Sequence, residues 1–245
     1  MNLPQKLKKS KLEDQHKVLI NKRDDNKKHL HKIQAKTPPR MKIERFSIDI
    51  PFFPQKTNSD CGPTTLQMVL AYFGQFPSLE EIKKEMKLKN EIAVNTSQIA
   101  IASSSFGHET TLYTKSVLPN QEFKDEEFYK KFSEEYFNES SKYIEFAKNI
   151  GVQIIEKTLT HDELLNLLTK DSVLIILLDW NVIIDNRGVG YQGHFVPIIG
   201  FDDESVYVHD PGTSNPSPDV KIPKEIFEKA RKAKGTDEDV VVVYR

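Results

Sequence analysis

The chain has 245 residues, 38% of them hydrophobic and 29% charged, which is enough for one large domain with a proper core. No apolar run approaches the roughly 18–20 residues that span a bilayer, and the lysine-rich N-terminus lacks the apolar segment of a secretory signal. A single cysteine excludes an internal disulfide, so we expect a soluble, cytoplasmic protein.

The first forty residues differ in character from the rest of the chain. Residues 1–40 hold twelve basic and four acidic side chains, a net charge of +8, whereas the whole chain has a net charge of −1. They also carry few apolar groups, so they cannot bury enough surface to offset the entropy of ordering. We expect a basic arm over 1–40, disordered or partly helical, that could contact an acidic partner, an acidic membrane or nucleic acid. A single folded domain then occupies residues 41–245.

The first half of that domain is predicted to be mainly helical. The alternating segment 42–53 predicts an entering strand that is closed by Pro51 and Pro54. Apolar residues at helical spacing then predict helices over 64–73, 79–86 and 96–104. They are followed by a short strand over 111–114, a long helical region over 124–149 that is broken near Asn138, and a strand over 152–156.

The second half is predicted to be mainly strands. A helix over 161–168, with Thr160 as its N-cap, and a helix over 223–232 interrupt them. Apolar runs predict strands over 172–179, 195–201, 205–209 and 239–244. Because helices come first and strands later, the sequence predicts an α+β domain.

Cys61, in SDCGPTTLQ, lies at an expected helix start. Pro63 suits the first turn, Gly62 allows a close approach to the backbone, and Asp60 or a residue beside it could cap the free amides. A thiol at the positive end of a helix can have its pKa lowered from ~8.5 to roughly 3.5–7.5, which favours the nucleophilic thiolate. Cys61 is therefore a candidate nucleophile, and a structural cysteine in the core is the alternative.

A cysteine nucleophile needs a base, and the base needs an orienting group. GHFVPIIGFDDESVYVHDPG predicts a β-hairpin that turns near residue 202, with His194 at its start and Asp210 at its end. The two therefore lie close across the ladder, whereas His209 points to the opposite face. We favour His194, oriented by Asp210, although a strand-edge histidine bonded to backbone is the alternative. The remaining histidines lie in the arm, in a polar loop or at a helix start: His16, His29, His31, His108 and His161.

The spacing of these residues resembles that of the papain-like cysteine peptidases. Gln55 precedes Cys61 by six residues, and Asp210 follows His194 by sixteen. Within that group, QKTNSDCGPTTLQMVLAYFG, GHFVPIIGF and HDPG are similar to the bacteriocin-processing (double-glycine leader) cysteine peptidases. The resemblance implies a papain-like fold with the nucleophile at a helix start and an antiparallel sheet in the C-terminal half. It also implies a Cys61–His194–Asp210 triad, with Gln55 as oxyanion donor.

A closer similarity, over roughly residues 48–244, is to the guanylyl cyclase domain-containing protein family of animals and plants. It rests on TLYTKSV, EEFYKKF, NIGVQIIEKTLTHDELLNLL, GYQGHFVPIIGF and ARKAKGTDEDVVVVY. Nucleotide cyclases of the usual kind need paired carboxylates that hold two metal ions, and the sequence offers no such pair. It also lacks the GxxxxGK[ST] loop that binds nucleotide phosphates. We interpret the candidate acidic residues as turn and cap residues: Asp179, Asp185, Asp202, Asp203, Asp237, Glu238 and Asp239.

The sequence thus favours a cysteine hydrolase, a peptidase or amidase, that acts on a peptide or amide substrate without a cofactor or a metal. An acyl or peptidyl transferase and a non-catalytic binding module are the alternatives, and we expect no nucleotide cyclase activity. Trp180 and Tyr191 precede His194 and could wall a substrate cleft or pack in the core. The sequence does not indicate the oligomeric state.

Overall fold

The structure is a computed structural model that describes residues 44–88, 94–118, 130, 134–185 and 190–245. The basic arm predicted over 1–40 lies outside the described residues, as does most of the first part of the helical region predicted over 124–149. None of the helices in the described ranges is long and apolar enough to cross a membrane.

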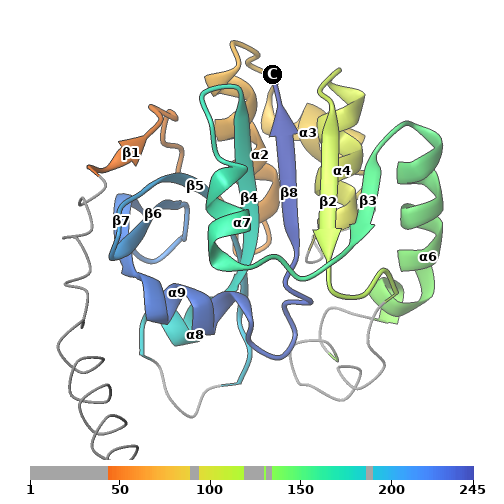
Figure 1. Cartoon of the computed structure of the whole chain (residues 1–245). Coiled ribbons are helices and arrows are strands. Elements are labelled where there is room, and N and C mark those ends of the chain that lie inside the picture. Colours follow the sequence, from red (N-terminus) through yellow and green to blue (C-terminus); the bar gives the residue numbers. More distant parts are fainter. Residues whose placement is uncertain (1–43, 89–93, 119–129, 131–133, 186–189) are drawn as a thin grey trace, which may run out of the picture. The chain divides into compact units, whose positions relative to one another are not determined.

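One sheet runs through the described part of the chain (Figure 1). Its eight strands follow the order β3 (Gln153–Glu156), β2 (Thr110–Thr114), β8 (Val240–Tyr244), β4 (Ser172–Asp179), β5 (Gly193–Phe201), β6 (Ser205–Asp210) and β7 (Ser217–Pro223), with β1 (Phe46–Ser47) paired to β5. Every pairing is antiparallel except that of β2 with β3, which is parallel. The expected α+β fold is confirmed. The sheet is antiparallel throughout except at the edge formed by β2 and β3.

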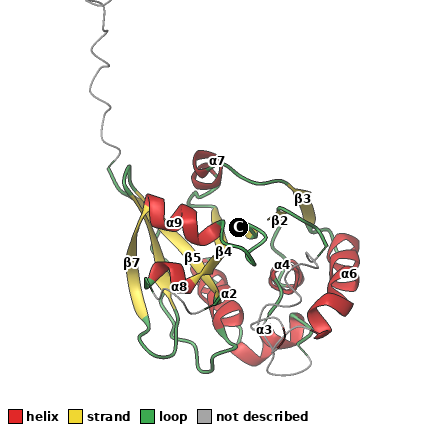
Figure 2. Ribbon diagram, turned by 90° about the horizontal axis from the view of Figure 1, so that it is seen from below, coloured by secondary structure: helices red, strands yellow, loops and turns green. Residues whose placement is uncertain are grey.

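Helices cover both faces of the sheet (Figure 2). On one side lie α2 (Cys61–Tyr72), α3 (Leu79–Glu85) and α4 (Thr96–Ser105), and on the other lie α7 (His161–Asn166) and α9 (Lys224–Arg231). α6 (Glu134–Asn149) packs against α4 and β3, and the one-turn α8 (Trp180–Ile183) follows β4. The central strands β4 and β8 are buried on both faces, which explains their continuous apolar runs.

Capping side chains explain where three of the helices begin. Ser78, Asn95 and Thr160 each accept a hydrogen bond from the first turn of α3, α4 and α7, while the Glu or Gln three residues later bonds back to the cap. Each reciprocal pair satisfies two amide groups that would otherwise lack a partner. The predicted cap at Thr160 is therefore confirmed.

Two local expectations are wrong, and two elements were not predicted. The strand expected over 42–53 is limited to Phe46–Ser47, because β4 pairs with β5 as far as Ile198 and leaves only the end of that edge, at Gly200 and Phe201, open to a third strand. α6 runs without a break through Asn138. The sequence did not predict β7 or α8, whose short or exposed segments lack a buried periodic pattern.

Candidate active site

Cys61 is the first residue of α2 and is half-buried. Pro63 and Gly62 lie in the same first turn, and a Cβ atom at Gly62 would come within 3.2 Å of Val94 and Ile99. A larger residue at this position would therefore push against both side chains. One turn further along α2, the Thr65 hydroxyl donates to the Phe195 carbonyl over 3.0 Å. These contacts hold the start of α2 against β5 beside His194.

Asp60 is the N-cap residue of α2, but its side chain makes no capping hydrogen bond. The carboxylate is instead almost fully buried, accepts a hydrogen bond from the Thr57 amide over 3.1 Å and pairs with Lys83 Nζ at 2.7 Å. Lys83 belongs to α3 and was not singled out in the sequence. The ion pair fastens the loop that precedes Cys61 to a neighbouring helix.

His194 and Asp210 meet across β5 and β6, as the hairpin pattern predicted. Ile198 pairs with Val208, so Asp210 lies diagonally from His194 on the same face of the ladder. His194 Nε2 lies 2.8 Å from Asp210 Oδ1, and both side chains are buried. The same carboxylate oxygen accepts a hydrogen bond from the Gly212 amide over 2.8 Å. The imidazole is therefore held in one orientation.

Because Nε2 of His194 is bonded to Asp210, the other ring nitrogen, Nδ1, is the one that can bond to Cys61. Burial disfavours the imidazolium, but hydrogen bonds to Asp210 and Cys61, together with the charges of both groups, outweigh it and raise the pKa of His194 to about 9. Burial likewise acts to raise the pKa of the Cys61 thiol, but the hydrogen bond and charge of His194, with smaller backbone contributions at Phe195 and Gly62, lower it below its ordinary value. The two shifts together favour a thiolate–imidazolium pair.

Gln55 lies beside this pair. Its backbone amide donates to the Pro211 carbonyl over 2.8 Å, which ties the loop before α2 to the residue that follows Asp210. Its side-chain Nε2 donates to the Thr57 carbonyl over 2.9 Å, and Oε1 is buried without a hydrogen-bond partner among the described residues. An amide nitrogen has two hydrogens, so one donor of Gln55 is left for another acceptor.

His209 has a different, structural set of contacts. Its Nδ1 accepts a hydrogen bond from the Asp219 amide over 3.1 Å, so Nε2 carries the proton and donates to the Ile50 carbonyl over 2.9 Å. Burial lowers the pKa of this imidazole and keeps it neutral. The ring points away from Asp210, as the alternation of strand side chains requires.

A groove of about 830 Å³ opens beside His194 and Asp210. Its walls come from Gln55, from Trp180 and Ile184 around α8, and from the segment between Gly212 and Lys221. The Trp180 ring meets that of His194 edge-to-face, with centroids 4.8 Å apart. Trp180 therefore lines the groove, whereas Tyr191 packs beneath Gly193 and Gly235 and is not among the residues that line it.

The acidic residues that the structure describes differ in their surroundings. Among the residues that the structure describes, no group of three or more His, Cys, Asp or Glu side chains is placed to hold a metal ion. Asp179 and Asp202 accept hydrogen bonds from nearby backbone amides, as turn and cap residues do. Asp237 and Asp239 are instead buried, and desolvation raises their pKa values to about 6 and about 7.

The fold resembles that of solved peptidases. A putative C39-like peptidase from Bacillus anthracis matches with a TM-score of 0.51 and 18% identity, over 83% of this chain and 98% of that one. A double glycine motif protease from an AMS/PCAT transporter, solved with a leader peptide, matches with a TM-score of 0.46 and 18% identity over the same shares. The α+β fold of this chain is thus similar to that of a C39-like peptidase.

The sequence comparisons name a different activity. "Guanylyl cyclase 1" of Arabidopsis thaliana is 26% identical over 211 residues, which are 80% of this chain and 76% of that protein. The family model described as "Guanylylate cyclase" matches residues 50–243, a span that contains Gln55 and every other residue of the site. Because this match covers most of the chain, the protein belongs to the guanylylate cyclase family so described, and it has a C39 peptidase-like fold.

Proposed function

We propose that the protein is a cysteine hydrolase that cleaves a peptide or amide bond through a thioester on Cys61. One observation carries the proposal: His194 is hydrogen-bonded to Asp210 on one side and to Cys61, the first residue of α2, on the other. The lowered pKa of the thiol and the raised pKa of the imidazole favour the reactive ion pair.

The first half of the reaction forms the acyl-enzyme. The Cys61 thiolate attacks the carbonyl carbon, a C–S bond forms, and the carbonyl π electrons move to oxygen. The remaining Nε2–H of Gln55 and the Cys61 backbone N–H donate to this oxyanion. The C–N bond then breaks as His194 gives its proton to the leaving amine, which departs and leaves a thioester and a neutral imidazole.

The second half releases the acid. Neutral His194 accepts a proton from water as the water oxygen attacks the thioester carbonyl. Collapse of the tetrahedral intermediate breaks the C–S bond, returns the thiolate and the imidazolium, and frees the carboxylic acid. Asp210 keeps the imidazole oriented in both halves. The groove beside His194 has room for several residues of a peptide.

The proposal is tested by the alkylation of Cys61, which is the sole thiol of the chain. We expect iodoacetamide to label the wild type fast at neutral pH, with an apparent thiol pKa well below ~8.5. His194→Ala should slow the labelling at pH 7 by about tenfold or more, because the buried thiol loses its cationic partner. His209→Gln is the matched control and should label as the wild type does. Intact mass reports each rate, and labelling that is slow or unaffected by His194→Ala would contradict the proposal.

Hydrolysis and acyl transfer are separated at the thioester. An acyl-enzyme formed from an activated ester can be challenged with water alone or with added amines. Release of the acid at a rate that amines do not change supports a hydrolase, whereas faster release as an amide supports a transferase.

The family description favours a second candidate, a guanylyl cyclase. The full-length protein would be incubated with GTP and Mg²⁺ or Mn²⁺, with Cys61→Ala alongside. Cyclic GMP formed equally by both proteins would support a cyclase that does not use the thiol. No cyclic product, together with fast thiol labelling, would leave the hydrolase as the sole candidate of the two.

A further inference from the structure

A second polar cavity lies away from the groove, between the start of α4, the end of β2 and the start of β8. Its volume is about 20 Å³, and it shares no lining residue with the groove beside His194. Oxygen-bearing side chains line most of it: Asp237, Asp239, Asn95, Ser97, Ser116 and Ser140. A cavity of this size holds one water molecule or one ion of similar size.

Asp239 presents an unsatisfied oxygen in this cavity. The side chain is nine-tenths buried, and the Thr96 hydroxyl hydrogen-bonds to the carboxylate, whereas the nearby Thr114 hydroxyl donates to the Ser116 carbonyl over 2.9 Å. Oδ1 nevertheless has no hydrogen-bond partner among the described residues. A buried carboxylate oxygen without a partner is costly, so a proton, a water or a cation is expected beside this atom.

Asp237 brings a second carboxylate to the same cavity. It is also nine-tenths buried, and its charge acts on Asp239. Arg231 and Lys115 each lie 3.7 Å from the carboxylate of the intervening Glu238, and the charge of Lys115 also acts on Asp237. Asp237 and Glu238 adopt φ values of 48° and 54°, a left-handed conformation that non-glycine residues rarely adopt. The GTDED segment thus places the side chains of two aspartates along the wall of one cavity, and the glutamate between them does not line it.

We propose that Asp237 and Asp239 bind a single Ca²⁺ ion in this cavity. The site offers oxygen ligands of carboxylate and hydroxyl type, which hard cations prefer. Two carboxylates match the charge of a divalent ion. Ca²⁺ tolerates irregular oxygen coordination at ~2.3–2.6 Å, whereas Mg²⁺ usually retains several waters, for which a cavity of about 20 Å³ has no room.

Such an ion would join three segments that are distant in the sequence. Asn95 and Ser97 belong to the start of α4, Thr114 ends β2, and Asp239 directly precedes β8. The site is independent of Cys61 and of the proposed hydrolase, and its effect would be on stability.

The test uses the full-length protein, stripped with EDTA and titrated with CaCl₂ by calorimetry and thermal unfolding. We expect one site, and a rise in Tm of roughly 5–10 °C when free Ca²⁺ is 100 times Kd. MgCl₂ and KCl at equal ionic strength should shift Tm by less than about a third of that amount. Asp239→Asn should abolish the heat and the shift, and Asp237→Asn serves as a second variant if the first does not fold. Asp162→Asn, an exposed position outside the cavity, is the matched control.

The variants also distinguish a cation site from a merely structural carboxyl. In EDTA, Asp239→Asn should unfold at or above the wild-type Tm, because a buried charge has been removed, whereas in CaCl₂ it should unfold below it. Absence of a Ca²⁺-dependent heat, a Ca²⁺-induced shift that persists in Asp239→Asn, or an equal response to Mg²⁺ would overturn the proposal. If no Ca²⁺-dependent heat is seen, the cavity holds a water molecule or a proton only.

Discussion

Gln55 makes one hydrogen bond that supports a loop and is assigned a second one to the oxyanion. Alkylation of Cys61 distinguishes the two roles, because it forms no oxyanion. One Nε2–H already donates to the Thr57 carbonyl, which holds the loop before Cys61. The other is assigned to the oxyanion, which forms when a carbonyl is attacked but not when iodoacetamide alkylates sulfur. A residue that acts only on the oxyanion should therefore affect one reaction of Cys61 and spare the other.

Gln55→Ala is expected to slow acylation of Cys61 by a p-nitrophenyl ester by about 10²–10³-fold, through the loss of one oxyanion donor. Its rate of alkylation by iodoacetamide should stay within about twofold of the wild type, because no oxyanion forms. The nitrophenolate burst and intact mass measure the two rates. Equal slowing of both reactions would mean that Gln55 only supports the loop.

The coupled pKa shifts of Cys61 and His194 predict two different pH profiles. As pH falls through the lowered pKa of the thiol, the thiolate is protonated, and both alkylation and ester turnover decline. As pH rises past about 9, His194 loses its proton and can no longer protonate a leaving amine, but the thiolate persists.

We therefore expect cleavage of an amide substrate to follow a bell-shaped profile and alkylation to keep a plateau above pH 9. The two profiles can be measured on the same preparation over pH 4–10. An amide profile that keeps rising above pH 9 would contradict the assignment of His194 as the proton donor.

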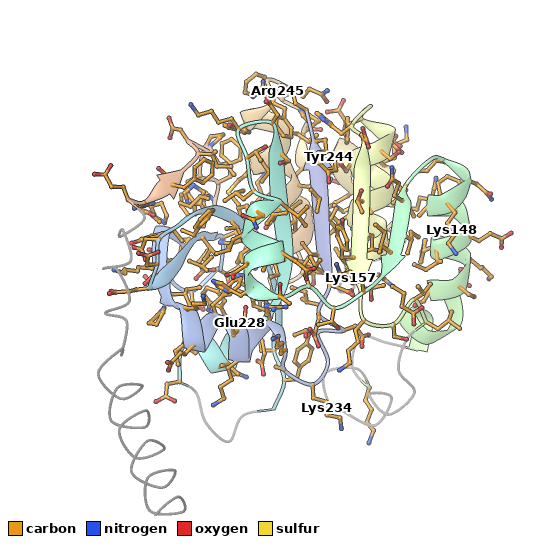
Figure 3. The ribbon with its side chains drawn as sticks, viewed as in Figure 1. Lys148, Lys157, Glu228, Lys234, Tyr244 and Arg245 are labelled. Atoms are coloured by element: carbon orange, nitrogen blue, oxygen red, sulfur yellow. The ribbon has the colours of Figure 1, made fainter. Side chains whose placement is uncertain are left out.

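At the scale of elements, α9 is fastened to α7 by a buried ion network. Figure 3 labels Glu228, which lies on α9. Its carboxylate accepts hydrogen bonds from Arg231 over 2.6 and 2.8 Å, and His161 Nδ1 lies 2.9 Å from it. Arg231, almost fully buried, also donates to the Leu159 carbonyl over 2.9 Å. These hydrogen bonds outweigh burial and lower the pKa of Glu228 far below its usual range.

Replacing Glu228 with Gln should lower the free energy of unfolding by roughly 1–3 kcal/mol at pH 7, because the buried Arg231 would keep only the more distant carboxylate of Glu238. Since the pKa of Glu228 is lowered on folding, its contribution is present above the unfolded pKa of ~4.3 and is lost as the pH falls below it. Urea unfolding at pH 7 and at pH 3 should thus show a smaller deficit at the lower pH. Asp171→Asn, in the exposed pair with Arg245, is the control and should cost less than about 1 kcal/mol.

At the scale of the molecule, the site and the described core both lie after residue 43. We expect deletion of residues 1–40 to leave the labelling rate of Cys61 and the Tm nearly unchanged. The same deletion should weaken retention on an anionic matrix such as heparin, because the removed residues carry a net charge of +8. Loss of thiol reactivity on deletion would show that residues 1–40 contribute to the site. A biological effect that needs the arm but survives Cys61→Ala would favour a non-catalytic binding module.

Particular segments show how far the sequence alone predicts the structure. β4 and β8 were predicted to within a residue, because VLIILL and VVVV are buried and flanked by polar residues. β7 was not predicted, since Pro218 and Pro223 and its mostly exposed side chains resemble a loop. The parallel pairing of β2 with β3 was also not predicted, because the sequence of neither strand indicates which strand it pairs with.

The sequence by itself determined the chemical groups of the candidate site and, for His194 and Asp210, their proximity. A hairpin is local, so its register can be read from two apolar runs and the turn between them. Only the tertiary structure decided that Cys61 lies against His194, over a hundred residues later in the chain, and that Asp60 pairs with Lys83 instead of capping α2. It also decided that Asp237 and Asp239 enter one cavity. Such neighbours depend on how α2, α4 and the sheet pack together, and that packing is the sum of many contacts spread along the whole chain.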